Sequence, residues 1–375
     1  MKGALKPEFF IGALSGTSID GIDVALVRFD PPPALVASHS LPYPEELRRE
    51  LLALCTPGET EIDRLGRADV LTGRCFAQAV QELLAKAALM PDAVTVIGSH
   101  GQTIRHRPAG PAPFTLQLGD PNVIAALTGI PVVADFRRKD MALGGQGAPL
   151  VPAFHEAVFR AAGRDRVVVN IGGIANLTVL PGDAAAPIAG FDTGPGNTLM
   201  DAWSRRVLSQ PMDRDGALAA RGRVAPALLA TLLADHYFKR TPPKSTGPEY
   251  FSSAWLDMHL AGTGPVADAD VQATLLALTA QTIAAALRQA AGTDAPGVFV
   301  CGGGANNPAL MAALRTQLPR ATVDRTDALG VAAGWVEAMA FAWLARQRWH
   351  AQPGNAPVVT GAMRPAVLGG LFLPQ

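Results

Sequence analysis

Cysteine is scarce in this sequence: Cys55, Cys75 and Cys301 are the three among 375 residues. Their number is odd, and no CxxC or Cys/His spacing accompanies them, which argues against a disulfide framework and against a zinc site. Long apolar runs are also missing, because Glu8 and Gly12 interrupt the stretch near the N-terminus and no later segment reaches about 18 unbroken apolar residues. These absences lead us to expect a cytoplasmic protein without a membrane partner.

The sequence also lacks an excess of either charge. Lys and Arg total 32, Asp and Glu total 32, and the pI is about 7.1. Without a net field the protein has no global attraction to nucleic acid, so small molecules are the expected partners. The length exceeds one ordinary hydrophobic core and suits two domains. The oligomeric state stays open, with a homodimer as one option.

Glycine, in contrast, is abundant and marks several turns. Residues 9–14 and 24–29 read as strands, and the segment SGTSIDGID (15–23) between them predicts a hairpin turn. Glycine lets a backbone approach a ligand closely, and the Thr17 and Ser18 hydroxyls can donate hydrogen bonds to phosphate oxygens. A polar turn with nothing bound is the alternative.

A second glycine turn, GFDTGPGN (190–197), contains a single acid. We expect Asp192 to be the last residue of a strand, and Asn197 to cap a helix over 198–208. A helix N-terminus favours anions, so Asp192 would lie beside a phosphate site. The alternative is that Asp192 only holds the turn together.

Polar residues also follow a predicted buried strand over 94–98. His100, Gln102 and Arg105 are candidates for contacts to a polar substrate, because open α/β sheets bind ligands at the carboxyl ends of their strands. In the charged loop that follows, Arg137 or Arg138 is suited to bidentate binding of a substrate carboxylate, and a solvated charge cluster is the alternative.

The second half of the chain repeats the opening design. Segment 167–180 reads as strand, glycine turn and strand, and a strand at 297–301 leads into three glycines that leave room for a flat adenosine ring or form a tight packing turn. Two glycine hairpins suggest two related lobes. We place the lobe boundaries so that residues 1–134 with 355–375 form the N-terminal lobe and residues 135–354 form the C-terminal lobe.

Eight segments, taken in order over nearly the whole chain, resemble the anhydro-N-acetylmuramic acid kinase family of bacterial cell-wall recycling. They are SGTSIDGID, SHGQTIRH, DFRRKDMALGGQGAPLVPAFH, NIGGIANLT, GFDTGPGN, PPKSTG, CGGGANN and VEAMAFAWLA. The resemblance implies an α/β protein with the two-lobed actin/hexokinase-like (ribonuclease H-like) fold, a β-sheet flanked by helices in each lobe, and ATP between the lobes.

The same resemblance implies roles for individual residues. Asp192 is implied as the catalytic residue, and ATP with Mg²⁺ as the cofactors, while the direct metal ligands stay open. The residues implied to bind nucleotide are Gly16, Thr17, Ser18, Ile19, Asp20, Gly21, Ile22, Asp23, Gly172, Gly173, Asn176, Gly302, Gly303 and Gly304. The residues expected to bind substrate are His100, Gln102, Arg105, Arg137 and Glu337.

The family's reaction converts 1,6-anhydro-N-acetylmuramic acid, ATP and water into N-acetylmuramic acid 6-phosphate and ADP. One carboxylate suffices if the departing 6-oxygen is captured by the γ-phosphorus, so that Asp192 only has to activate water. One departure from the family is visible, since the proline pair and acid that usually precede the last helix are absent from residues 329–337. A phosphatase or ATPase, and a non-catalytic nucleotide-switched scaffold, are the alternatives on the same fold.

Overall fold

Two compact units make up the chain. The computed structural model describes residues 8–30, 32–242, 244–247, 249–291 and 296–374. One unit contains Met1–Phe154 together with Trp335–Gln375, and the other contains His155–Gly334. Segments 135–154 and 335–354, which we expected in the C-terminal lobe, thus group with the first unit. The nucleotide and catalytic roles expected of each lobe stay predictions.

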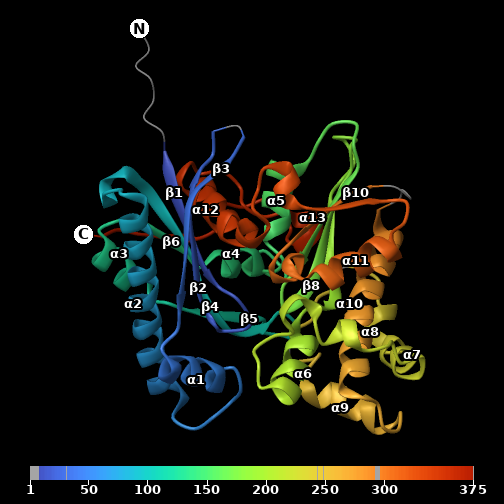
Figure 1. The fold of residues 1–375 in the computed structure, drawn as a ribbon. Coiled ribbons are helices and arrows are strands. Elements are labelled where there is room, and N and C mark those ends of the chain that lie inside the picture. Colours follow the sequence, from blue (N-terminus) through green and yellow to red (C-terminus); the bar gives the residue numbers. More distant parts are fainter. Residues whose placement is uncertain (1–7, 31, 243, 248, 292–295, 375) are drawn as a thin grey trace. The chain divides into compact units, whose positions relative to one another are not determined.

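The first unit is built on a seven-stranded mixed sheet with the order β12-β6-β4-β1-β2-β3, and β5 pairs with β4 off this path (Figure 1). Neighbouring strands β1, β2 and β3 are antiparallel, whereas β4 is parallel to β1 and β6 is parallel to β4. The strands are β1 (Phe9–Ser15), β2 (Gly21–Arg28), β3 (Ala34–Pro42), β4 (Val94–Arg107), β5 (Phe114–Leu118), β6 (Val132–Ala134) and β12 (Gly370–Phe372).

Helices cover both faces of this sheet. The helices that group with the first unit are α1 (Glu45–Leu54), α2 (Glu61–Ala87), α3 (Pro121–Thr128), α4 (Phe136–Ala142), α12 (Val336–Trp349) and α13 (Pro357–Thr360). Helix α5 (Val151–Phe159) contains the boundary between the units. The apolar side of α2 packs into a core with Ile11, Val24 and Leu26. Central strand β1 is therefore buried on both faces, which explains its nearly continuous apolar sequence.

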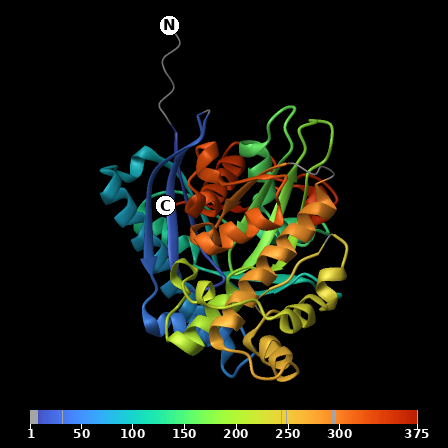
Figure 2. The same ribbon diagram turned by 45° about the vertical axis from the view of Figure 1, so that its right-hand side comes forward.

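Glycines let helix α12 approach the sheet closely (Figure 2). Gly12 of β1 and Gly98 of β4 are paired in register. A Cβ atom on Gly12 would overlap the carbonyl oxygen of Ala338, and one on Gly98 would overlap that of Phe341. Any larger residue at these two positions would push α12 off the sheet.

The second unit has a five-stranded sheet with the order β11-β10-β7-β8-β9. Strands β7, β8 and β9 are antiparallel neighbours, while β10 is parallel to β7 and β11 is parallel to β10. The strands are β7 (Arg166–Ile171), β8 (Ile174–Leu180), β9 (Ala189–Pro195), β10 (Gly297–Cys301) and β11 (Thr322–Arg325). Both sheets thus contain an antiparallel three-strand meander followed by two parallel strands, and β12 adds an antiparallel strand to the first sheet. This is the ribonuclease H-like arrangement that the family resemblance implies.

The helices of the second unit are α6 (Thr198–Leu208), α7 (Pro226–Leu233), α8 (His236–Lys239), α9 (Ser253–Ala261), α10 (Asp268–Ala290) and α11 (Pro308–Gln317). Short 3₁₀ helices cover Pro91–Ala93, Arg214–Gly216, Ala219–Arg221, Gly303–Asn306, Thr326–Leu329 and Ala333–Trp335. Among the described residues, α10 alone is long and apolar enough to cross a membrane, but 78% of its apolar window is buried. Such burial is typical of a core helix.

Candidate active site

Three polar residues lie side by side across the sheet of the second unit. Asn176 of β8 pairs in register with Asn170 of β7 on one side and with Asp192 of β9 on the other. Paired residues on adjacent strands point to the same face, with Cβ atoms about 5 Å apart. The structure therefore brings Asn176, expected at a phosphate, next to Asp192, expected to be catalytic.

Asp192 is held by a loop that follows α8. Its Oδ2 accepts a hydrogen bond from the backbone N of Thr246 at 3.0 Å, and its own backbone N donates to the carbonyl oxygen of Lys244 at 3.2 Å. The Tyr237 hydroxyl donates to the backbone oxygen of Asp192 at 2.8 Å. Asp192 lies in the middle of β9, so its expected place at the end of a strand was wrong, because pairing with β8 continues to Pro195.

The turn between β7 and β8 is joined to the start of α6. The carbonyl oxygens of Gly172 and Gly173 accept hydrogen bonds from the backbone N atoms of Gly196, Asn197 and Thr198 at 2.8 to 3.1 Å. The Asn197 side chain makes no cap and donates to Ile171 O instead. Asn197 thus occupies the N-cap position as expected, but the side-chain capping bond is absent. These three N–H groups have protein acceptors, which weakens the idea of an anion site at this helix N-terminus.

The triple glycine after β10 is packed against β7. A Cβ atom on Gly302, whose φ is 81°, would overlap Asn170 Oδ1, and one on Gly304 would overlap the Ile171 side chain. Gly303 has more room, since its nearest neighbour would be Asn197 Nδ2 at 3.6 Å. Gly302 and Gly304 thus have a structural reason to be glycine, whether or not adenosine binds beside them.

The turn of the first-unit hairpin is exposed at its first three residues and buried at its isoleucines. Gly16, Thr17 and Ser18 are exposed, and a Cβ atom on Gly16 would meet nothing within 4 Å. The side chains of Ile19 and Ile22, in contrast, belong to the hydrophobic core. Only backbone atoms of these two isoleucines are suited to contact a nucleotide.

Two acids flank this turn. Asp20 is exposed and forms an ion pair with Arg48 at 3.2 Å. Asp23 is the third residue of β2, and its carboxylate accepts a hydrogen bond from Ser40 Oγ at 2.5 Å. Burial raises the pKa of the Asp23 carboxyl group, although this hydrogen bond opposes the shift. Among the described residues, no three His, Cys, Asp or Glu side chains gather as a metal cage. One or two carboxylates with water would still suit Mg²⁺, which keeps much of its hydration.

Strand β4 is longer than expected. It continues from Gly98 through Arg107, because it pairs with β1 first and with β5 after Gly101. His100 and Gln102 therefore lie within a strand, and the expectation that the strand stops before them was wrong. A Cβ atom on Gly101, with φ at 75°, would meet the Leu118 carbonyl oxygen at 2.5 Å.

His100 and Arg137 are in direct contact. Arg137 Nε donates to His100 Nε2 at 3.0 Å, and its NH1 group donates to Gly147 O at 2.8 Å. Burial and the Arg137 charge hold the pKa of His100 well below its ordinary value, so its imidazole is neutral and accepts from the guanidinium. Arg138, the alternative carboxylate ligand, is exposed and pairs with Asp135 at 2.8 Å. Both arginines lie on helix α4, where we expected a loop.

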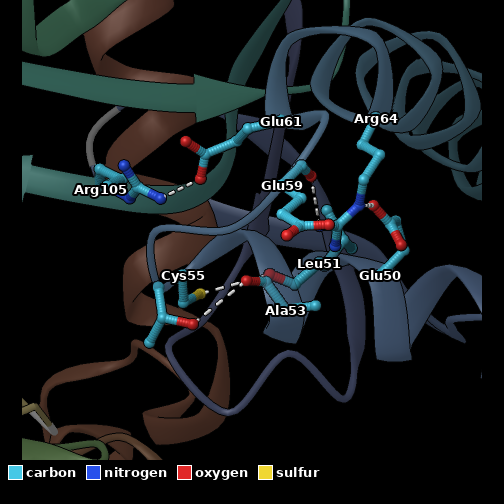
Figure 3. Close-up of polar contacts among 9 residues, drawn as sticks. Glu50, Leu51, Ala53, Cys55, Glu59, Glu61, Arg64 and Arg105 are labelled. Atoms are coloured by element: carbon cyan, nitrogen blue, oxygen red, sulfur yellow. Dashed lines mark hydrogen bonds and ion pairs between the residues drawn. The ribbon is translucent and has the colours of Figure 1, made fainter.

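Gln102 and Arg105 have partners inside the first unit. Ser15 Oγ donates to Gln102 Oε1 at 2.5 Å, and Gln102 Nε2 donates to Thr103 O at 3.0 Å. Arg105 forms an ion pair with Glu61 at the start of α2 (Figure 3). These contacts tie β4 to β1 and to α2, which is a sufficient structural reason for both residues.

Asp140 is a buried carboxylate that the sequence analysis did not select. It is 0% exposed, and it accepts hydrogen bonds from Gly147 N at 2.9 Å and from Asn355 Nδ2 and Thr360 Oγ1 at 2.8 Å each. The carboxylate thus fixes the glycine loop whose Gly147 carbonyl anchors Arg137. Only the tertiary packing of residues more than 200 positions away reveals this role.

Glu337 is half-buried in the first turn of α12, where the helix dipole stabilises a negative charge. The segment before it, which departs from the family pattern, is held by two hydrogen bonds of Ala333. Gly302 N donates to Ala333 O at 2.9 Å, and Ala333 N donates to Asp327 Oδ2 at 3.3 Å. Asp327 therefore supplies an acid at this segment from a different position in the chain.

The duplicated strand order and a carboxylate on the second sheet define a class, the α/β proteins with the fold of actin and sugar kinases. A family model for anhydro-N-acetylmuramic acid kinase matches residues 8–374. The chain belongs to the anhydro-N-acetylmuramic acid kinase family.

Relatives of that name are similar over almost the whole chain. The relative from Shewanella amazonensis is 53% identical over 369 residues, covering 98% of this chain and 99% of its own length. The relative from Shewanella frigidimarina is 54% identical with the same coverage, and the one from Coxiella burnetii is 51% identical, covering 98% of each chain.

Solved structures give more distant matches. A ROK family glucokinase from Streptomyces griseus, in complex with glucose and AMPPNP, has a TM-score of 0.42 and 14% identity, covering 90% of this chain and 99% of its own. The (R)-2-hydroxyglutaryl-CoA dehydratase component A from Acidaminococcus fermentans has a TM-score of 0.46 and 12% identity, covering 88% and 95%.

Proposed function

We propose that the protein is an ATP-dependent kinase that opens the 1,6-anhydro ring of anhydro-N-acetylmuramic acid with water and phosphorylates the 6-oxygen. The products are N-acetylmuramic acid 6-phosphate and ADP, a step of peptidoglycan recycling in the cytoplasm. The observation that carries this proposal is the family match over residues 8–374, supported by relatives of that name at 51 to 54% identity.

Asp192 is the base in this proposal. It takes a proton from the water that attacks the anomeric carbon, while the departing 6-oxygen attacks the γ-phosphorus, so no second acid is required. The Thr246 N–H bond to Oδ2 supports the role, because it stabilises the ionised carboxylate and fixes its orientation. Asn176, which pairs in register with Asp192, orients the water or a phosphate oxygen in this proposal.

The glycine turns bind ATP in this proposal. In the first unit, the exposed Gly16, Thr17 and Ser18 contact phosphate through backbone N–H and hydroxyl groups. In the second unit, Gly172 and Gly173 in the turn before β8 and Asn176 within β8 contact phosphate, and Gly302 to Gly304 contact adenosine. Asp20 or Asp23 would hold Mg²⁺ through water, and the ion would neutralise charge at the phosphates.

The sugar's carboxylate is bound by Arg137, whose guanidinium is oriented by His100 and Gly147. Glu337 contacts a sugar hydroxyl in the same proposal. Gln102 acts mainly by holding β4 in position, since its oxygen and nitrogen have partners within the first unit, and the NH2 group of Arg105 pairs with Glu61 in the same unit.

An assay of ADP release against a panel of sugars tests the proposal. We expect ADP with 1,6-anhydro-N-acetylmuramic acid and none with N-acetylmuramic acid, which has no anhydro bond to open. Anhydro-N-acetylglucosamine, which lacks the carboxylate, should react much more slowly if Arg137 binds that group. ADP release without any sugar would indicate an ATPase, and no release with any sugar would favour a non-catalytic scaffold.

A further inference from the structure

Lys244 lies beside Asp192 and has no role in the function described so far. Its backbone oxygen accepts a hydrogen bond from Asp192 N at 3.2 Å, and two residues later Thr246 N donates to the Asp192 carboxylate at 3.0 Å. The loop therefore contacts both the main chain and the side chain of the proposed base. Pro243, the preceding residue of the PPKSTG segment, lies outside the described residues.

The Lys244 side chain is buried, with only 5% of the residue exposed. Its ammonium lies 4.9 Å from the ring centre of Tyr237 and 5.7 Å from that of Phe191, the residue before Asp192. Within the part of the chain that the structure describes, no hydrogen bond or ion pair of this ammonium is found. Burial and the Arg240 charge lower the pKa of Lys244, whereas the Asp192 carboxylate opposes that shift.

We propose that Lys244 is a positioning residue whose ammonium keeps Asp192 ionised and ready to accept a proton from water. A cation near a carboxylate favours its charged form, and Lys244 is a neighbour of Asp192 through the backbone bond from Asp192 N to Lys244 O at 3.2 Å. The inference rests on the proposed function, because it gives Lys244 a role in the chemistry of that same base.

A purely structural role fits Lys244 poorly. Removing most of the water around an ammonium costs stability, and a residue such as methionine would contact the Tyr237 and Phe191 rings without that cost. A lysine retained in such a place is expected where its charge serves function at the expense of stability.

Other charges surround this pair. Arg240 lies over the same Tyr237 ring at 5.6 Å, but its side chain is exposed, so solvent screens its effect on Asp192. Asp235 is occupied by hydrogen bonds from Tyr250 and Trp255. The remaining charged or titratable groups of the elements around the loop are His236, Lys239 and Glu249.

The test compares Lys244→Met with Lys244→Arg by the pH dependence of kcat/KM at saturating ATP. In Lys244→Met, the acid limb of the pH profile of kcat/KM should move to higher pH by about one unit. At pH values below this limb kcat/KM should therefore be about tenfold lower than in the wild type, and at about pH 8 the loss should be smaller. Lys244→Arg keeps the charge and should restore the position of the limb. The melting temperature of Lys244→Met should be unchanged or higher.

Arg240→Met is the matched control, and it should leave the limb within a few tenths of a unit of the wild type because it removes an exposed charge. An unmoved limb in Lys244→Met would overturn the inference, as would a Lys244→Arg variant with the same displaced limb. If the wild type is inactive with the anhydro-sugar, the proposed function fails instead. A lower melting temperature with an unmoved limb would make Lys244 a packing residue only.

Discussion

The two units share one strand order but differ in what lies against their central strands. In the first unit, Gly12 and Gly98 expose the backbone of β1 and β4 to helix α12. In the second unit, the corresponding parallel pair, β7 and β10, consists largely of buried valines, Val167, Val168 and Val169 beside Val298 and Val300. The same topology therefore tolerates two kinds of packing, one through backbone contact and one through branched side chains.

The polar residues of the two units differ as well. In the first unit, Gln102 binds Ser15, Arg105 binds Glu61, and Asp140 accepts three hydrogen bonds, so much of the polar chemistry stabilises the unit itself. In the second unit, Asp192 is bonded through its backbone to the buried Lys244, whose ammonium forms no ion pair within 4.0 Å among the described residues. Incomplete charge pairing is typical of reactive sites. The difference predicts that catalysis depends most on the second unit.

The largest effect is expected from Asp192→Asn. Asparagine keeps the shape and still accepts from Thr246 N, but it cannot take a proton, so kcat should fall by roughly two to four orders of magnitude. Steady-state kinetics and calorimetry check it, because sugar and ATP affinities should be nearly unchanged. Asp257→Asn, which removes an exposed partner of Arg206, should stay near wild-type activity. A joint loss of affinity, rate and stability would make Asp192 a structural brace.

The next largest effect is a difference in stability between valine substitutions at two glycines of the first hairpin, Gly12 and Gly16. Gly12→Val should destabilise the first unit by about 3 kcal/mol or more, because the side chain overlaps the Ala338 carbonyl and α12 must move. Gly16→Val should leave stability nearly unchanged, since nothing lies within 4 Å of the new Cβ atom. Urea unfolding of both variants measures the difference. Equal stabilities would contradict the close packing of α12.

Gly16→Val should instead affect the nucleotide. If the turn holds ATP phosphates, a valine excludes them and raises the dissociation constant for ATP by about tenfold or more, with the fold intact. Titration calorimetry on the folded variant gives this value directly. Unchanged ATP affinity would remove the first hairpin from the nucleotide site.

The smallest effect is a pH dependence in the first unit. Burial and the charges of Arg137 and Arg107 lower the pKa of His106 from 6.5 to about 4. Between these values the unfolded chain takes up the proton and the folded chain does not, so stability falls as pH drops from about 6.5 to about 4. Over this pH range the free energy of unfolding of His106→Gln should fall by about 1 kcal/mol less than that of the wild type, as measured by urea midpoints. The exposed His236→Gln is the control, and identical slopes for all three proteins would refute the assignment.

Much of the fold could be predicted because its signals are local. The apolar spacing of α2 and α10, the glycine turns after β1 and β7, and the buried runs of β1 and β10 are all visible in a short window of sequence. Strands β3, β5, β11 and β12 were missed because several of them are half-exposed and short, and their pairing depends on neighbours. Helix α4 was missed because its charges read as a loop.

The site was predictable in part for the same reason. Asp192 stood out because a lone acid precedes a glycine turn, whereas Lys244 and Asp140 are distinguished only by burial, which distant elements create. Asn176 was assigned to the second phosphate loop from the family resemblance, whereas the structure places it within β8, and its register with Asp192 required the sheet. Pairing with β5 likewise decided that β4 runs past His100.

The central claim is that water attacks the sugar's anomeric carbon and the sugar's 6-oxygen attacks phosphorus. Reaction in oxygen-18 water, followed by mass spectrometry of the phosphorylated product, tests it most directly. The proposed mechanism predicts one label on the anomeric hydroxyl, read in quenched samples before that hydroxyl exchanges with solvent, and none on the phosphate. Label in the phosphate would mean that water attacks phosphorus, which would contradict the kinase mechanism and the role of Asp192 in it.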